Sequence, residues 1–375
     1  MKERKMRGIQ RTRGSTLSVF GSLLVCVACH RDRVPEPESI AVATPVAAPL
    51  PTQAAPALTA EVSAAVPTAV GSAHPPRPGV EISAGPRGKI KHVFVIALEN
   101  HDSDEIYGDT VNAPYLHGLI AKYAHTENFE DELPLEIPSE GHYVWMEAGT
   151  HHFSDVTFVD DEDPSPQVST GSPKHLVTQI KAAGGGLSWM SYQEGLNEKT
   201  GACPIKFSGF YVPKHNPFIF FRDVAGDPPS KDNAYCAEHH RPYAALESDL
   251  AQDQVASYVF ITPDECHDMH NQPGCPDENP IRTGDNWLKA ELPRLIAYAE
   301  KHSSVIFLTF DEGGSTNLLP FIAIGAGVKP HYTSKVRYTH SSQLKSVELI
   351  LGVPVLPAVS EANDFSDLFL PGSFP

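Results

Sequence analysis

Three short apolar runs that end in polar side chains constrain what this chain can fold into. They are VFVIAL at 93–98, YVFIT at 258–262 and VIFLTF at 305–310. None of them alternates apolar and polar residues, so each predicts a strand buried on both faces, as in a parallel sheet. Polar side chains follow the first and third runs directly, namely Glu99, Asn100, Asp311 and Glu312. In open α/β sheets, sites form at the carboxyl ends of such strands.

Segments with helical spacing separate the apolar runs. Apolar residues recur every three or four positions, as in amphipathic helices, in residues 112–124, 175–183, 286–301 and 342–351. Two further apolar segments, 187–192 and 321–324, predict strands, and residues 197–245 are expected to be mostly loop. The alternation predicts an α/β fold with a mostly parallel central sheet flanked by helices.

The first 88 residues are expected to lie outside the folded domain. Residues 1–29 carry basic residues and then an apolar stretch too short to span a bilayer, which indicates an export signal. Small residues before Cys29 match a lipoprotein processing site, so we expect lipidation there, with plain secretion as the alternative. Residues 30–88 are rich in proline and alanine and predict a disordered tether. Residues 89–375 then form one domain, either anchored at the outer membrane or cell surface, or secreted or periplasmic.

The charge of the chain limits its partners. The formal net charge is −17 at pH 7. So acidic a chain is not expected to bind nucleic acid or to adhere electrostatically to anionic lipid. A membrane contact is therefore expected only through an N-terminal lipid anchor.

Four cysteines follow the export signal, namely Cys203, Cys236, Cys266 and Cys275. An even number in an exported chain favours two disulfides. We expect Cys266–Cys275 to close a small loop and Cys203–Cys236 a larger one. A zinc site is the alternative, although these four cysteines contain no CxxC pair.

The polar residues after the first and third runs predict a metal site. If those two strands are neighbours, Glu99, Asn100, Asp311 and Glu312 meet at one sheet edge as an oxygen-rich cluster suited to a divalent cation. The alternative is that each pair only caps the loop that follows it.

Further candidate site residues follow the second run and begin the last helix. The loop after 258–262 contains Asp264, His267, Asp268 and His270, which can hold an anion or a metal, or simply form a polar surface loop. His340, at the start of the last helix, is placed to donate to an anion. Ser139 lies in a turn that would expose its hydroxyl as a nucleophile. The sequence contains neither a glycine-rich phosphate loop followed by lysine nor a GxSxG motif, which disfavours nucleotide binding and the α/β-hydrolase fold.

A series of motifs occurs in a fixed order along residues 90–355, namely VFVIALEN, NAPYLHGLIAKYA, IPSEGHYVWMEAG, GLSWMSYQEG, KHNPF, ITPDECHDMH, GDNWL, TFDEGG and THSSQLKSVELILG. In that order they resemble the bacterial phosphoesterase family, which groups secreted acid phosphatases with phospholipases C within the alkaline phosphatase superfamily. The resemblance is closer to the short acid-phosphatase branch. It implies an alkaline-phosphatase-like three-layer sandwich with a mostly parallel central sheet.

The resemblance also implies roles for individual residues. Ser139 matches the nucleophile that becomes phosphorylated, and His340 or His270 would protonate the leaving oxygen. The EN and DE pairs match the family's metal site, and the residues that line the phosphate pocket match His215, Asp268, His270 and His340. Where the family commonly has asparagine, this chain has His142, Asp264 and His267. We expect His142 and His267 to contact the substrate and to affect substrate preference.

The sequence thus predicts an exported acid phosphatase that hydrolyses phosphate monoesters through a phosphoserine, with a divalent metal ion of unspecified identity and number. Its substrate would be a small phosphorylated molecule or a phospholipid headgroup. Histidine acids predict activity at mildly acidic pH. The alternatives are a phospholipase C-type phosphodiesterase and a non-catalytic surface lipoprotein that retains the fold.

Overall fold

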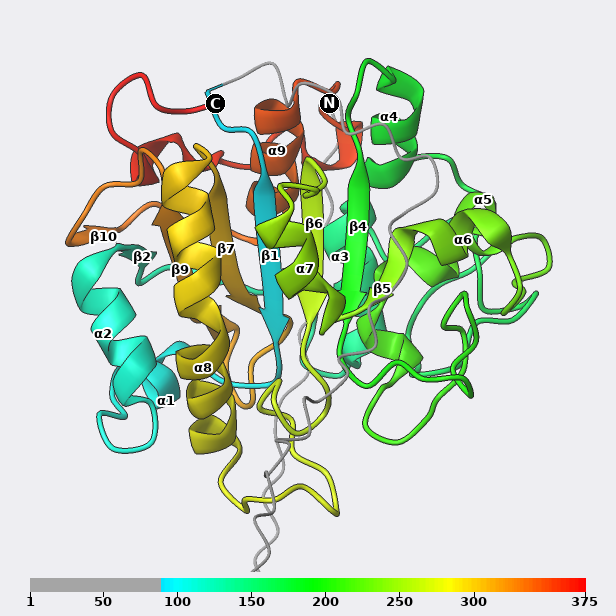
Figure 1. Ribbon diagram of the computed structural model, residues 1–375, viewed down its shortest axis with the longest axis horizontal. Coiled ribbons are helices and arrows are strands. Elements are labelled where there is room, and N and C mark those ends of the chain that lie inside the picture. The colour runs from blue at the N-terminus through cyan, green and yellow to red at the C-terminus, as the bar shows by residue number, and fades with distance from the viewer. Residues whose placement is uncertain (1–88) are drawn as a thin grey trace, which may run out of the picture. The chain divides into compact units, whose positions relative to one another are not determined.

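The computed structural model describes residues 89–375, so the expected signal, Cys29 and the tether lie outside the described residues. A central sheet of eight strands dominates this part of the chain (Figure 1). Its strands are β1 (Val93–Leu98), β2 (Ala124–Thr126), β4 (Trp189–Gln193), β5 (His240–Pro242), β6 (Tyr258–Thr262), β7 (Val305–Phe310), β9 (Phe321–Gly325) and β10 (Tyr332–Ser334). Their order is β10-β2-β9-β7-β1-β6-β4-β5, and β9 alone runs antiparallel to its neighbours β2 and β7.

The three apolar runs form adjacent strands at the centre of this sheet. β1 pairs in parallel with β7 on one side and β6 on the other. Leu98 lies opposite Phe310, so Glu99 and Asp311 leave the sheet side by side. Every residue of β1, β6 and β7 is buried, as expected for runs without alternation. The condition on which the predicted oxygen-rich cluster depends, that the first and third runs are neighbours, is therefore met.

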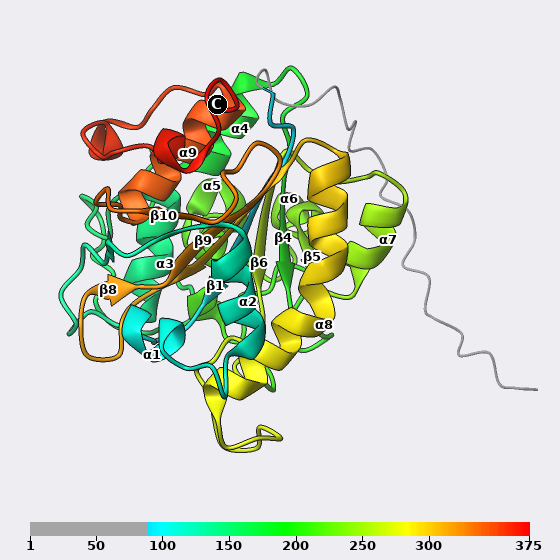
Figure 2. The same cartoon turned by 90° about the vertical axis from the view of Figure 1, so that its left-hand side faces the viewer.

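Helices cover both faces of the sheet, which confirms the predicted α/β class. They are α1 (Ser103–Tyr107), α2 (Pro114–Lys122), α3 (Ser139–Ala148), α4 (Leu176–Ala183), α5 (Arg222–Ala225), α6 (Ala234–His239), α7 (Ala245–Ala251), α8 (Pro280–Lys301) and α9 (His340–Leu351). Figure 2 shows α7 and α8 on one side of the sheet and α3, α4 and α9 on the other. The sheet and these two helical layers make three layers.

Short elements complete the described part. A second sheet pairs β3 (Phe129–Glu130) with β8 (Leu318–Leu319). Four 3-10 turns are η1 (Pro213–His215), η2 (Pro217–Phe220), η3 (Pro357–Val359) and η4 (Phe365–Leu368). Within residues 89–375, no helix is both long and apolar enough to cross a membrane.

Two helices begin earlier than their apolar spacing predicts. α8 starts at Pro280, six residues before the expected start, because the Asn279 side chain accepts a hydrogen bond from Arg282 N at 2.9 Å and proline suits a first helical turn. α9 starts at His340, where Thr339 caps the helix. The strands β2, β5 and β10 were not expected, since three residues are too few to show a period.

The four cysteines pair as the sequence predicts. Cys203 bonds to Cys236, and Cys266 bonds to Cys275. The alternative zinc site at these cysteines is therefore wrong. The Cys266–Cys275 bridge closes the loop after β6, which contains Asp268 and His270.

Candidate active site

Buried carboxylates gather where β1 and β7 end. Glu99 and Asp311 are fully buried, and Glu312 is nearly so. Asn100 has a positive φ of 40°, and its backbone N–H donates a hydrogen bond to Asp311 Oδ1, with 3.3 Å between nitrogen and oxygen. Burial, reinforced by the charge of Asp268, raises the pKa of Glu99 well above its usual range. Burial and the charges of Glu99 and Glu312 do the same to the pKa of Asp311. The cluster therefore needs a positive charge to stay ionised.

The predicted nucleophile lies against this cluster. Ser139 is the first residue of α3 and is 2% exposed. Its Oγ is 3.3 Å from Glu99 Oε2 and 3.2 Å from Glu312 Oε1, so the hydroxyl can donate to either carboxylate. Two potential proton acceptors thus lie beside one serine at the carboxyl edge of the sheet.

A tyrosine and a histidine support Glu99 from the other side. The Tyr143 hydroxyl donates to Glu99 Oε1 at 2.5 Å, and its ring stacks on His215 with 5.0 Å between centroids. His215 Nε2 is 3.4 Å from Glu99 Oε2, and its Nδ1 is 3.3 Å from Asp268 Oδ2. Burial, followed by the charge of Lys214, lowers the pKa of His215 well below its usual range, so the ring is neutral.

Several oxygen and nitrogen atoms in this region that could bind a metal ion have no hydrogen-bond partner. They are Asn100 Oδ1, Asp311 Oδ2, Asp268 Oδ2, Glu265 Oε1 and both ring nitrogens of His215, all of them buried. His215 Nδ1 and Asp268 Oδ2 are close, but their geometry does not make a hydrogen bond. Glu99, His215 and Asp268 also bring one ligand atom each within 4.8 Å of the others. The residues present therefore fit a divalent cation.

His142 lies near Glu312, and His340 groups with His142 and Asp131. His142 Nδ1 is 3.1 Å from Asp131 Oδ1, and its Nε2 is 3.7 Å from Glu312 Oε2. Burial alone lowers the pKa of His142, but the hydrogen bond to Asp131 and the charges of Asp131, Asp311 and Glu312 outweigh it and raise this pKa to about 9. His340 is buried with its Nε2 facing Phe310 O at 2.8 Å.

The other two predicted histidines lie on the loop after β6. His270 Nδ1 is 3.5 Å from Glu265 Oε2, its ring centroid is 6.3 Å from that of His215, and its side chain is 31% exposed. His267 belongs to a separate, partly exposed group, in which its Nδ1 lies 3.0 Å from Glu194 Oε2 and 3.2 Å from Asp264 Oδ1. The structure thus brings His270, but not His267, toward the cluster around His215.

Four residues of the site were not predicted from the sequence. Tyr143 lies one helical turn after Ser139, a spacing that could have indicated it. Lys214 and Glu265 are immediate neighbours of predicted residues in the KHNPF and PDECHDMH motifs. Asp131 follows a two-residue strand, and nothing in the local pattern marks it.

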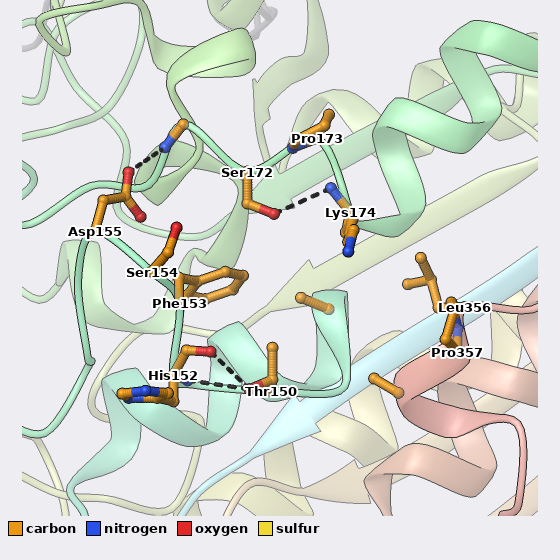
Figure 3. A pocket seen from close by; sticks show the side chains of 13 residues that line it. Thr150, His152, Phe153, Ser154, Asp155, Ser172, Pro173, Lys174, Leu356 and Pro357 are labelled. Carbon is orange, nitrogen blue, oxygen red and sulfur yellow. Dashed lines mark hydrogen bonds between the residues drawn. The ribbon is translucent and has the colours of Figure 1, made fainter.

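A separate cavity does not contain any of these residues. It has a volume of about 650 Å³ and lies between the end of α3, residues 171–174 and the start of η3. Figure 3 shows its polar lining, in which Asp155 accepts from Gly171 N at 2.8 Å and Ser172 Oγ accepts from Lys174 N at 3.3 Å. Asp155 and Ser172 of this cavity pair with neighbouring backbone, so the buried atoms without a hydrogen-bond partner at the sheet edge mark the better candidate site.

Comparison with known proteins identifies the class of enzyme. Over 294 residues the chain is 26% identical to the phosphatidylinositol-3-phosphatase of Mycobacterium tuberculosis, covering 78% of this chain and 87% of that protein. It is 28% identical to a probable acid phosphatase of Kluyveromyces lactis, covering 71% of this chain and 59% of the yeast protein. A solved protein of the alkaline phosphatase superfamily from Vibrio parahaemolyticus matches 76% of this chain and 72% of its own, with a TM-score of 0.47 and 12% identity. The protein is a hydrolase acting on phosphoric ester bonds.

A family model gives the more specific assignment. The model of the Phosphoesterase family matches residues 112–354, which include Ser139, the KHNPF and DMH motifs and the DE pair. The chain belongs to the Phosphoesterase family. The resemblance found in the sequence is thereby confirmed, whereas the roles of the individual site residues stay predictions.

Proposed function

We propose that this protein is an exported acid phosphatase that hydrolyses phosphate monoesters through a phosphoserine at Ser139. One observation carries the proposal: the Ser139 hydroxyl lies 3.3 Å from Glu99 Oε2 and 3.2 Å from Glu312 Oε1. The surrounding cluster contains buried oxygen and nitrogen atoms that have no hydrogen-bond partner. Relatives named acid phosphatases support the monoester class. A serine between two carboxylates has an acceptor ready for its proton when it attacks.

In the proposed reaction the Ser139 oxygen attacks phosphorus in line with the leaving oxygen. The Oγ–P bond forms as the bond from phosphorus to the ester oxygen breaks, and the hydroxyl proton passes to Glu312. Water then attacks the phosphoserine, which releases phosphate and restores the hydroxyl.

The leaving oxygen needs a proton as it departs. His270 is better placed to donate it than His340, because the side chain of His270 is 31% exposed whereas His340 is buried against Phe310 O. His215, kept neutral by burial, can donate one hydrogen bond to a phosphoryl oxygen. A histidine acid favours turnover at mildly acidic pH, where imidazolium is populated.

A divalent ion would be held by Glu99, Asn100, Asp311 and Glu312, with Asp268 and His215 within reach. When bound, it would neutralise the cluster and the charge on the phosphoryl oxygens. Without such a charge the cluster would repel a phosphate dianion, since Glu99 and Asp311 are both fully buried acids.

Export and anchoring are proposed from the N-terminal sequence. A basic segment, a short apolar stretch and Cys29 support a lipoprotein signal. The two disulfides in residues 89–375 support an oxidising destination outside the cytoplasm. Mass spectrometry of the mature N-terminus would detect a lipid on Cys29.

A phosphorylated lipid headgroup is the second candidate substrate. The relative from Mycobacterium tuberculosis is named a phosphatidylinositol-3-phosphatase, and it aligns over 78% of this chain. A membrane-anchored enzyme would meet such substrates at the bilayer surface.

The direct test is hydrolysis of p-nitrophenyl phosphate by the wild type, Ser139→Ala and Ser154→Ala. Ser154 lies in the separate cavity of Figure 3 and is the matched control. We expect Ser139→Ala to lose about three orders of magnitude or more in kcat and Ser154→Ala to lose nothing. EDTA should abolish wild-type turnover, and a divalent ion should restore it.

Other outcomes distinguish the alternatives. Full activity in Ser139→Ala would exclude Ser139 as the nucleophile. Turnover of bis-p-nitrophenyl phosphate or phosphatidylcholine without turnover of the monoester would favour the phospholipase C-type diesterase. No turnover of any of these esters, or of phosphatidylinositol 3-phosphate, would favour a non-catalytic lipoprotein.

A further inference from the structure

A second group of possible ligands lies behind the proposed catalytic cluster. Asp131, His142 and His340 are all buried, and each brings one ligand atom within 4.8 Å of the other two. They come from three parts of the chain: the segment after β3, the first turns of α3 and the first residue of α9. None of them belongs to the group formed by Glu99, His215 and Asp268.

The two histidine rings are oriented alike by backbone carbonyls. His142 Nε2 lies 2.9 Å from Ile137 O, and His340 Nε2 lies 2.8 Å from Phe310 O. A carbonyl oxygen can only accept, so the proton of each ring is on Nε2. In a neutral imidazole the lone pair is then on Nδ1. Histidines that bind metals are typically held in this way, with the other ring nitrogen donating to a carbonyl or carboxylate.

Asp131 faces Nδ1 of His142, whose lone pair holds a proton in the metal-free ring. Its Oδ1 accepts from Leu133 N at 3.0 Å and lies 3.1 Å from His142 Nδ1, while its Oδ2 is buried without a hydrogen-bond partner. A carboxylate oxygen and an imidazole lone pair at this distance need a cation between them. A proton can serve His142 and Asp131 Oδ1, but it leaves Asp131 Oδ2 unsatisfied.

A divalent ion can replace this proton and also take His340 as a third ligand, which a single proton cannot do. Bonds of about 2.0–2.1 Å to zinc place neighbouring ligand atoms about 3.3 Å apart at tetrahedral angles. The separation of 3.1 Å between His142 Nδ1 and Asp131 Oδ1 is close to that value. Two nitrogens and a carboxylate form a set that suits Zn²⁺, whereas the oxygen-rich cluster around Glu99 suits a harder ion.

We propose that Asp131, His142 and His340 form a second divalent-cation site of zinc type, separate from the carboxylate cluster that surrounds Ser139. Its positive charge would lie beside Glu312, since His142 Nε2 is 3.7 Å from Glu312 Oε2. The ion would offset part of the repulsion among the buried acids and fix the position of His142. The site rests on its own geometry and does not depend on the proposed phosphatase activity.

Zinc stoichiometry tests the proposal without measuring turnover. Metal-free protein is dialysed to equilibrium against Zn²⁺ as the wild type, as His142→Asn and as His117→Asn. His117 is exposed and belongs to no ligand group, so it is the control. We expect His142→Asn to bind one Zn²⁺ fewer than the wild type and His117→Asn to bind the same number. Circular dichroism checks folding, and the isosteric Asp131→Asn replaces His142→Asn if that variant does not fold.

X-ray absorption at the zinc edge identifies the ligands. Each of the other two ligand groups in the described residues contains a single histidine. Glu99→Gln protein loaded with one equivalent of Zn²⁺ should therefore show two imidazole ligands. Equal stoichiometry in the wild type and His142→Asn, or a zinc with no more than one imidazole, would overturn the proposal and leave a proton shared by His142 and Asp131.

Discussion

At the level of single residues, the site depends on how Glu99 is held. One of its carboxylate oxygens accepts from Tyr143 at 2.5 Å, and the other faces Ser139 and His215. Tyr143 also supports the His215 ring by stacking, so one tyrosine orients two members of the cluster. We regard Tyr143 as a positioning residue, because its hydroxyl donates to Glu99 and its ring stacks on His215.

Replacing Tyr143 with phenylalanine should weaken metal binding while keeping the stacked ring. Loss of a group that orients a ligand typically costs about 10–100-fold in metal affinity or activity. Isothermal titration with Mn²⁺ would measure the change, and kcat should fall in parallel. Tyr107→Phe is the control, since the Tyr107 hydroxyl donates to Thr126 O at 2.9 Å and belongs to none of the ligand groups. An unchanged metal affinity in Tyr143→Phe would contradict this role.

At the level of secondary structure, α3 connects the site to the helical layer. Ser139 begins the helix, and Glu147 lies two turns further on. Glu147 Oε1 accepts from Val177 N at 2.7 Å and lies 3.1 Å from His175 Nδ1, which ties α3 to the start of α4. His175 Nε2 reaches Asp223 Oδ1 at 2.9 Å in α5. One buried histidine therefore joins three helices.

This histidine predicts how stability depends on pH. Burial alone lowers the pKa of His175, but the hydrogen bonds to Asp223 and Glu147 and their charges outweigh it, so this pKa is raised above 6.5. The imidazolium therefore stabilises the fold fully below pH 6.5, and this contribution is lost as the pH rises through the folded-state pKa. Removing the imidazole should make stability depend less on pH in that range.

Urea unfolding of the wild type and His175→Gln between pH 5 and 9 tests this expectation. The stability difference between them should shrink with rising pH, by on the order of 1 kcal/mol. His331→Gln, at an exposed position, should follow the wild type. A difference that is constant across this range would show that His175 does not titrate as expected.

At the level of the whole molecule, the buried runs allowed the centre of the fold to be predicted. β1, β6 and β7 are continuous apolar segments, and the polar residues after β1 and β7 do meet at one edge. The strand order could not be read from the sequence, because pairing is a long-range property. β2, β5 and β10 have three residues each, and their pairing rather than their sequence makes them strands.

The site was predictable only where motifs or strand ends marked it. Glu99 and Asp311 follow apolar runs, and Ser139 lies in a motif of the family. Asp131 and His340 come together with His142 through folding of segments about 200 residues apart, which no local pattern reports. His267 lies in a recognisable motif, and one of its partners, Asp264, is close in sequence. Its other partner, Glu194, follows β4, and only the pairing of β4 with β6 brings it near.

The covalent intermediate is the central claim of this account. The wild type would be quenched in acid during turnover of p-nitrophenyl phosphate, digested, and analysed by mass spectrometry for phosphopeptides. We expect a phosphate on Ser139 in the peptide that contains IPSEGHY, and none at this position when substrate is omitted. Turnover with no phosphate on Ser139, or with phosphate trapped on another residue, would contradict the mechanism.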